Sequence, residues 1–137
     1  LADPLHADIE WHISEPLNVD AMNGAASLFL GEHDFTSFCR RPKGQPAQAL
    51  VRRIRSSQWI AQTQQRIQFQ IAANAFCHQM VRSLTGFCVA VGLGKCEAET
   101  FEAVLKAQNR AAAPPIAPPH GLILQHVTYG ESDGQGQ

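Results

Sequence analysis

Two residues with ionic or acid–base chemistry, His78 and Arg82, stand four positions apart in the stretch ANAFCHQMVRSLTG, residues 73–86. Positions four apart lie on one face of an α-helix. Small and apolar residues surround them, so the guanidinium of Arg82 is expected near the interior of the domain. A buried, unpaired cation costs so much free energy that it requires a carboxylate or phosphate partner. The chemistry predicted here is the binding of an anion.

No such partner is found close to Arg82 in the sequence. The forty-seven residues before it and the fourteen after it contain no Asp or Glu. Either a distant carboxylate folds back onto Arg82, or its partner lies outside this chain. The sequence leaves a third reading equally open, in which the aliphatic stem carries the charge out to water.

Cationic side chains are concentrated in the middle of the chain. The net charge at pH 7 is −1, yet residues 35–96 contain none of the twelve carboxylates. Surfaces that serve solubility alone usually mix both signs, so this segment favours a polyanionic partner such as a nucleic acid over a merely solvated sheet face. The nine cations of the segment are Arg40, Arg41, Lys43, Arg52, Arg53, Arg55, Arg66, Arg82 and Lys95.

The four cysteines, Cys39, Cys77, Cys88 and Cys96, form no C-x-x-C pair and have no nearby His pair at metal-ligand spacing. We therefore predict no zinc or other metal, four inert thiols that act as small hydrophobic residues, and a reducing cytoplasm. A Cys77 nucleophile assisted by His78 is disfavoured, because adjacent residues point to different sides of a strand or helix.

With 137 residues, of which 45% are hydrophobic, the chain can form one domain with a substantial core. It contains no apolar run of about 18 residues, so no transmembrane helix is expected. The first residues do not resemble a signal peptide, and a chain that opens on Leu1 is expected to have been processed or to be a piece of a longer protein. The polar, glycine-rich residues 131–137 are expected to be disordered.

Periodicity predicts the elements that must position Arg82. A helix is expected over 16–31, with Asn18 as N-cap and Gly31 as the C′ residue, followed by a loop over 32–46 with one helical turn. Strands over 49–60 and 66–76 are expected to pair in an antiparallel manner. The apolar stripe of the first helix consists of Met22, Ala25, Ala26 and Phe29.

A central helix over 77–91, a further helix over 96–110 and a strand over 121–129 complete the predicted order. The central helix has an apolar stripe and a stripe of small residues, which allows close approach to neighbouring elements. The fold class is therefore α+β, an antiparallel sheet with helices packed on one face. The two stripes consist of Val81, Leu84, Cys88 and Val91, and of Ser83, Gly86 and Ala90.

Three segments resemble, in order and spacing, the C-terminal half of the TruA-type tRNA pseudouridine synthases: LFLGEHDFTSFC, FQIAANAFCHQMVRSLTG and HGLILQHVTY. The resemblance extends over residues 11–129. It implies that residues 1–130 are the C-terminal domain of such an enzyme, one half of a pseudouridine synthase fold. These enzymes isomerise uridine to pseudouridine in the anticodon stem-loop of tRNA, using an aspartate and no cofactor.

The resemblance also implies roles for two residues. Arg82 would pair with the catalytic aspartate and keep it ionised and aimed at the flipped-out nucleotide, and Leu122 would form an apolar wall of the uracil pocket. The family's aspartate motif, of the G-R-T-D-A-G-V kind, is absent from this chain. Asp34, in GEHDF, stands in a family-like block, but the resemblance does not make it the nucleophile. We therefore expect this chain alone to be inactive.

The basic segment is expected to contact RNA phosphates, which provides affinity and position rather than sequence choice. The expected partners are tRNA, the enzyme's own N-terminal catalytic domain and, in the complete protein, a second copy, with no membrane. The alternative is a non-catalytic RNA-binding or dimerisation module, whereas the cysteine and histidine spacing disfavours a metal- or thiol-based enzyme. The candidate RNA-binding residues are Arg40, Arg41, Lys43, Arg52, Arg53, Arg55 and His78. For His78 a hydrogen bond within the fold is an equally open alternative.

Overall fold

The computed structural model describes residues 5–12, 17–40, 50–63, 66–77 and 79–113, together with the backbone of 122–127. The expected tail, 131–137, lies outside these residues. Among them, no helix is long and apolar enough to cross a membrane. In chain order the elements are β1 (Leu5–His12), α1 (Val19–Leu28), β2 (Gly31–Asp34), the 3-10 helix η1 (Thr36–Phe38), β3 (Val51–Ala61), β4 (Arg66–Ala73), α2 (Met80–Gly92), α3 (Thr100–Ala107), the 3-10 helix η2 (Arg110–Ala112) and β5 (Leu122–Val127).

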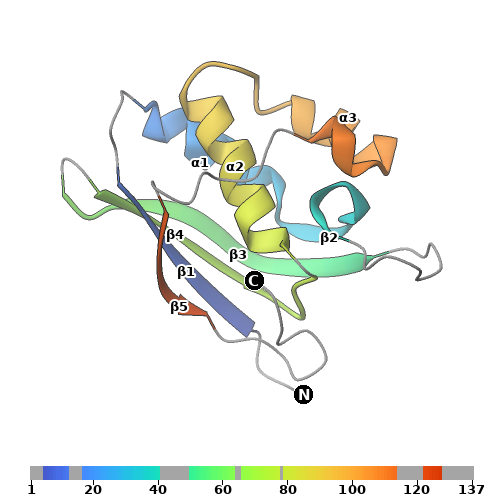
Figure 1. Ribbon diagram of the computed structural model, residues 1–137, viewed down its shortest axis with the longest axis horizontal. Coiled ribbons are helices and arrows are strands. Elements are labelled where there is room, and N and C mark those ends of the chain that lie inside the picture. The colour runs from blue at the N-terminus through green and yellow to red at the C-terminus, as the bar shows by residue number, and fades with distance from the viewer. Residues whose placement is uncertain are drawn as a thin grey trace.

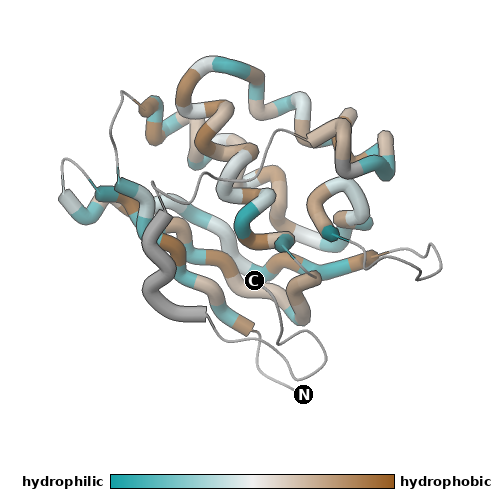
Figure 2. The backbone as a smooth tube through the Cα atoms, in the orientation of Figure 1, coloured by the Kyte–Doolittle hydropathy of each residue, from teal (hydrophilic) through white to brown (hydrophobic). Residues whose placement is uncertain are grey.

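The described strands form one five-stranded sheet in the order β2-β3-β4-β1-β5, and every neighbouring pair is antiparallel. The three α-helices cover one face of this sheet (Figure 1), which confirms the predicted α+β class. Along the strands, hydrophobic and hydrophilic residues alternate (Figure 2). On β4, Phe69 is buried and stacks on Trp59 of β3, with ring centroids 4.9 Å apart. The predicted pair of strands is thus the middle of the sheet.

Two strands were not predicted. β1 lies between β4 and β5, and its residues Ala7, Ile9 and Trp11 alternate into the core. The prediction of a loop over 32–46 was wrong for β2, which pairs with β3 through Glu32 and Arg53. The helical turn expected in the same loop is confirmed as η1. β1 joins β4 to β5, and β2 extends the sheet at its other edge.

Helix α1 begins as predicted, because the Asn18 side chain accepts a hydrogen bond from the backbone N–H of Ala21 at 3.0 Å. All four residues of its predicted stripe are buried. The predicted C′ role of Gly31 is wrong, since the helix ends at Leu28 and Gly31 is the first residue of β2. The positive φ of Gly31, 94°, lets the chain turn directly from the helix into that strand.

Helix α2 is the centre of the domain, and almost every residue in it is buried. It begins at Met80 rather than at the predicted Cys77, because Gln79 has a left-handed backbone with φ 66°. Its close approach to α1 is confirmed: the backbone N–H of Asn18 donates to the carbonyl of Gly92 at 2.9 Å. Of the predicted small stripe, Ser83 and Gly86 are buried and Ala90 is half-buried.

Helix α3 is shorter than the predicted 96–110. Its buried Phe101 joins an aromatic cluster with Phe29, Phe38 and Phe87, with ring centroids 4.9 to 5.9 Å from that of Phe101. The helix ends at Gln108, where the backbone turns left-handed with φ 48°. α3 therefore closes the core over α1 and η1.

The expectation of four inert thiols is wrong for one pair. Cys39 and Cys77 form a disulfide with a Cα–Cα distance of 5.7 Å. They are 38 residues apart in sequence. The fold brings the segment after η1, which contains Cys39, close to the connection between β4 and α2, which contains Cys77. Cys88 is a buried free thiol as expected, and burial raises its pKa from 9.0 to about 12. The remaining free thiol, Cys96, is half-buried, and its pKa is also raised by burial.

The contact between α1 and α2 allows no side chain at Gly92. A Cβ there would lie 2.7 Å from Cγ and Sδ of the fully buried Met22. We expect Gly92→Ala to lower the free energy of unfolding by about 1–3 kcal/mol, as overpacked cores do. Gly24→Ala is the matched control, because a Cβ there meets nothing within 4 Å, and it should raise stability by about 0.5–1 kcal/mol. Urea denaturation of both variants tests this, and equal shifts in the two would contradict the packing argument.

Candidate functional site

Arg82 lies in the first turn of α2, where the helix leaves the core, and its side chain is half-buried. Its Nε atom is buried and has no hydrogen-bond partner among the described residues. Two ion pairs between described residues, Arg53 with Glu32 at 3.7 Å and Arg66 with Glu10 at 3.3 Å, do not involve Arg82. The predicted combination is therefore present: a partly desolvated guanidinium with no described carboxylate beside it.

Asp34 was the carboxylate of a family-like block that could have folded back onto Arg82. Instead it accepts hydrogen bonds from the backbone N–H of Thr36 at 3.0 Å and from that of Leu50 at 3.2 Å. The Thr36 hydroxyl and the Gln108 side chain also donate to it. Asp34 thus fastens the end of β2 to η1, to the start of β3 and to the end of α3. Its role in the described structure is to hold the fold together.

His33, the neighbour of Asp34, is also occupied within the fold. Its Nε2 lies 2.9 Å from the carbonyl oxygen of Leu30, and its ring meets the rings of Phe35 and Phe101 edge-on, with centroids 5.7 and 5.8 Å away. The GEHDF block therefore positions chain segments around α3 rather than presenting a reactive group.

The three arginines of β3 do not act as one group. Arg53 precedes the buried Ile54 and points to the sheet face opposite the helices, whereas Arg55 lies at the register shift after Ile54; both side chains are exposed. Arg52 is half-buried on the helix side, and its Nη1 donates to the carbonyl of Val51 at 3.0 Å. The structure thus separates Arg52 from the two exposed arginines.

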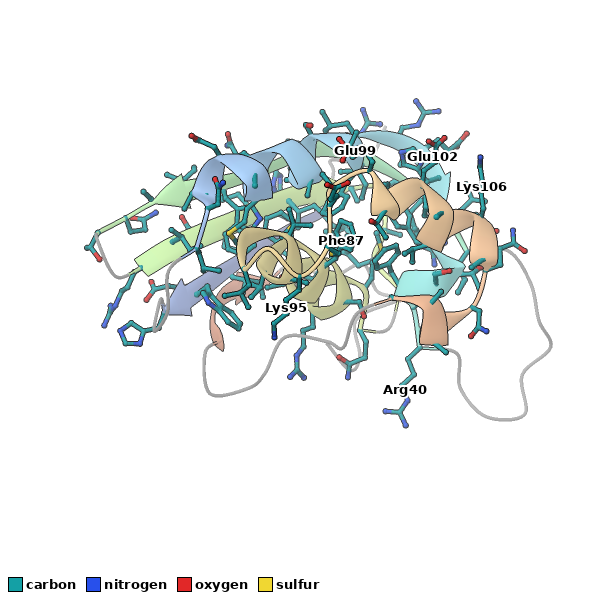
Figure 3. All side chains as sticks on the ribbon, turned by 90° about the horizontal axis from the view of Figure 1, so that it is seen from above. Arg40, Phe87, Lys95, Glu99, Glu102 and Lys106 are labelled. Atoms are coloured by element: carbon teal, nitrogen blue, oxygen red, sulfur yellow. A yellow bond between two sulfur atoms is a disulfide. The ribbon has the colours of Figure 1, made fainter. Side chains whose placement is uncertain are left out.

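Arg40 follows η1 and is exposed, and its side chain extends away from the fold (Figure 3). Leu122 begins β5, where its backbone is paired with that of Trp11 on β1. The Leu122 side chain, like Arg41, Lys43 and His78, lies outside the described part of the chain. These candidates remain predictions.

A polar row on the open sheet face was not predicted. Glutamines of β3 and β4 and the turn between them donate to one another: Gln58 to Gln70 at 3.3 Å, Gln70 to Gln68 at 3.1 Å and Gln62 to Gln68 at 2.8 Å. Beside them, Arg66 pairs with Glu10, whose side chain is only 10% exposed. The alternation of glutamine with apolar residues in RIQFQI predicts a half-buried strand with one polar face, but not the hydrogen bonds that join the glutamines across it.

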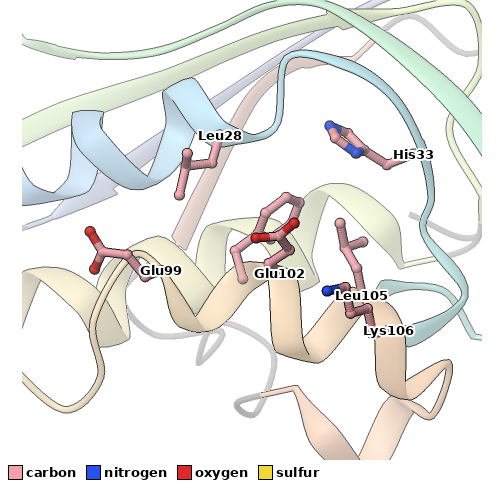
Figure 4. Close-up of a pocket in the computed structure, with 7 residues that line it drawn as sticks. Leu28, His33, Glu99, Glu102, Leu105 and Lys106 are labelled. Carbon is pink, nitrogen blue, oxygen red and sulfur yellow. The ribbon is translucent and has the colours of Figure 1, made fainter.

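A surface cavity of about 410 Å³ lies elsewhere, between the end of α1, β2 and α3 (Figure 4). Its walls are apolar, with acidic and basic residues at the rim, and none of the predicted site residues lines it. Among the described residues, no group of three or more His, Cys, Asp and Glu could hold a metal ion. The lining residues are Leu28, His33, Glu99, Phe101, Glu102, Leu105 and Lys106.

Comparison with known proteins identifies one family. The sequence profile of the family described as tRNA pseudouridine synthase matches residues 25–130. A tRNA pseudouridine synthase A 2 of Protochlamydia amoebophila is 34% identical over 92% of this chain. Proteins named tRNA pseudouridine synthase A from Streptomyces griseus and Myxococcus xanthus are 37% and 40% identical over 93% and 92% of it. The matches cover 48%, 44% and 47% of these three relatives, so the chain spans about half their length.

The unpartnered state of Arg82 predicts the effect of removing its charge. Arg82→Met keeps an apolar stem of similar length, so the free energy of unfolding should stay the same or rise by about 1 kcal/mol. Arg66→Met is the control and should lower stability by about 1 kcal/mol, because it removes the ion pair between Arg66 and the largely buried Glu10. Urea denaturation compares the two. A loss above about 2 kcal/mol in Arg82→Met would mean that Arg82 holds the domain together.

Proposed function

Because this chain belongs to the tRNA pseudouridine synthase family, we propose that it is the C-terminal domain of an enzyme that isomerises uridine to pseudouridine in the anticodon stem-loop of tRNA. The domain would contribute tRNA binding and the arginine that pairs with the catalytic aspartate. The observation that carries the proposal is the buried, unpartnered Nε of Arg82 at the start of α2.

Arg82 would act on the aspartate in two ways. Its positive charge would keep the pKa of the carboxyl low, so that the aspartate is ionised when the nucleotide arrives. Its planar guanidinium would hold both carboxylate oxygens in one orientation, which a lysine ammonium cannot do. Helix α2 supports this role, because a helix buried along its length allows little movement of its first turn. The glycosidic bond would then break at an oriented carboxylate, and the base would rejoin through carbon.

Binding of tRNA would use exposed cations of the domain. Arg40 is exposed beyond η1, and Arg53 and Arg55 are exposed on β3, so all three can reach phosphates without leaving the fold. Arg41, Lys43 and His78 would extend the contact along the chain. Arg52 is the least favourable of the predicted contacts, because it points toward the helix side. Phosphate contacts would position the stem-loop, and extrusion of the target uridine would be least costly where stacking is weakest.

The remaining parts of the proposal concern the whole protein. We expect Leu122 to border the uracil, the aspartate to come from an N-terminal half, the complete enzyme to be a homodimer, and its location to be the cytoplasm.

A non-catalytic RNA-binding or dimerisation module is the second candidate, favoured by the absence of the aspartate motif from the chain. The reading frame upstream of Leu1 separates the two, since a G-R-T-D-like motif there supports the enzyme and a start codon immediately before Leu1 supports the module.

The proposal predicts that the chain alone has no pseudouridine-forming activity, because Arg82 has no aspartate to orient. Tritium release from uridine-labelled tRNA is the assay, and turnover above background would contradict the missing-aspartate reading.

In an enzyme that includes an aspartate-bearing half, Arg82→Met should lower kcat by several orders of magnitude. The control, Arg55→Met, should mainly raise KM, since it removes only a phosphate contact.

The proposal also predicts weak, salt-sensitive binding of tRNA by the chain. If about three phosphates are neutralised, the logarithm of the affinity should fall with the logarithm of the salt concentration with a slope near −3. Reversal of Arg40, Arg41 and Lys43 to Glu should abolish most binding. Reversal of Lys106 to Glu is the control and should have a much smaller effect, because Lys106 projects from α3 on the side of Figure 3 opposite to that of Arg40. Filter binding at several salt concentrations measures both, and salt-independent binding would refute the proposed contact.

A further inference from the structure

The Cys39–Cys77 disulfide joins two segments to which the proposed function gives separate tasks. Cys39 directly follows η1 and precedes the exposed Arg40. Cys77 lies in the connection between β4 and α2, five residues before Arg82. The sequence separates the two cysteines by 38 positions, but the fold places their Cα atoms 5.7 Å apart, within the range for a disulfide.

The bridge acts directly on the start of α2. The carbonyl of Cys77 accepts a hydrogen bond from the backbone N–H of Met80 at 3.1 Å, so the cross-linked residue is joined directly to the first residue of the helix. Gln79, between them, has an unfavourable left-handed backbone, and its side chain does not cap the helix. The first turn thus lacks the usual side-chain cap. The covalent link to Cys39 supplies a constraint at the same place.

We propose that Cys39 and Cys77 are a site of reversible thiol oxidation, and that the disulfide braces the α2 start against the segment that carries Arg40. The oxidant would be a hydroperoxide. One thiolate attacks an oxygen of the peroxide and becomes a sulfenic acid. When the oxidant is hydrogen peroxide, the leaving group is released as water. The second sulfur attacks that sulfenic sulfur, which forms the S–S bond and releases a second water. A dithiol reductant returns both thiols by exchange and is itself oxidised to a disulfide.

The other two cysteines of the chain, Cys88 and Cys96, are free thiols in the structure. Cys88 is fully buried, and its thiol stays protonated at neutral pH because burial raises its pKa to about 12. The pKa of Cys96 is also raised, and Cys96 is a free thiol. Protonated thiols are poor nucleophiles. Cys39 and Cys77 are themselves only 3% and 4% exposed, so local opening of the Cys39 loop would have to precede reaction with the oxidant.

The modification is tested first without RNA. The reduced chain is treated with hydrogen peroxide, the remaining thiols are alkylated, and peptides are mapped by mass spectrometry. The expected product has lost two hydrogens and links Cys39 to Cys77, while Cys88 and Cys96 are alkylated after unfolding. Dithiothreitol should reverse it. Cys96→Ser should react like the unmodified chain, and Cys39→Ser and Cys77→Ser should not form the bridge. A link between other cysteines, or none in the folded chain, would overturn the site.

The bracing is tested by hydrogen exchange and by tRNA binding. The oxidised chain should protect the amides at the start of α2 at least several-fold more than the reduced chain. Its affinity for tRNA should be about three- to tenfold higher, because the backbone next to Arg40 is held in place before binding. Cys39→Ser should show neither difference. The affinity readout rests on the proposed function, so absence of tRNA binding in both forms would refute that function alone. Equal exchange in both forms would refute the brace.

Discussion

The central constraint in this domain is the burial of α2. A helix enclosed on nearly all sides must be packed by α1, α3 and the sheet together, and Gly92 shows how close this packing is, since no side chain fits against Met22. The aromatic cluster around Phe101 closes the same core from the other side. Arg82 lies in the first turn of this helix. The packing that stabilises the domain therefore also fixes the position of the Arg82 guanidinium.

The sequence predicted best where local chemistry decides the structure. Asn18 marked the start of α1, glutamine and apolar residues alternated along β4, and two stripes identified α2 as central. The alternation of Ala7, Ile9 and Trp11 in β1 was equally readable and was overlooked. β2 is a different case, because four residues with a glycine carry little strand preference, and only pairing with β3 makes them a strand.

In the candidate site, too, some features could be predicted from the sequence and others required the fold. The lack of an acidic neighbour for Arg82 could be counted in the sequence, and the structure agrees among the described residues. The separation of Arg52 from Arg53 and Arg55 needed the strand's register and its irregularity near Ile54, which composition does not reveal. The Cys39–Cys77 pair needed the full topology, because spacing rules for cysteines describe neighbours in sequence rather than the ends of distant loops.

Asp34 illustrates how a family-like block can mislead a genetic experiment. Its hydrogen bonds to Thr36, Leu50 and Gln108 join three regions of the domain, so nearly any replacement would leave backbone amides unsatisfied and reduce the amount of folded protein in the cell. Under the proposed function, a saturation mutagenesis screen of a complete enzyme, scored by tRNA modification, would therefore return Asp34 and Arg82 as equally intolerant positions. Only a parallel measurement of protein abundance would distinguish the residue that maintains the fold from the one whose charge is available to a partner.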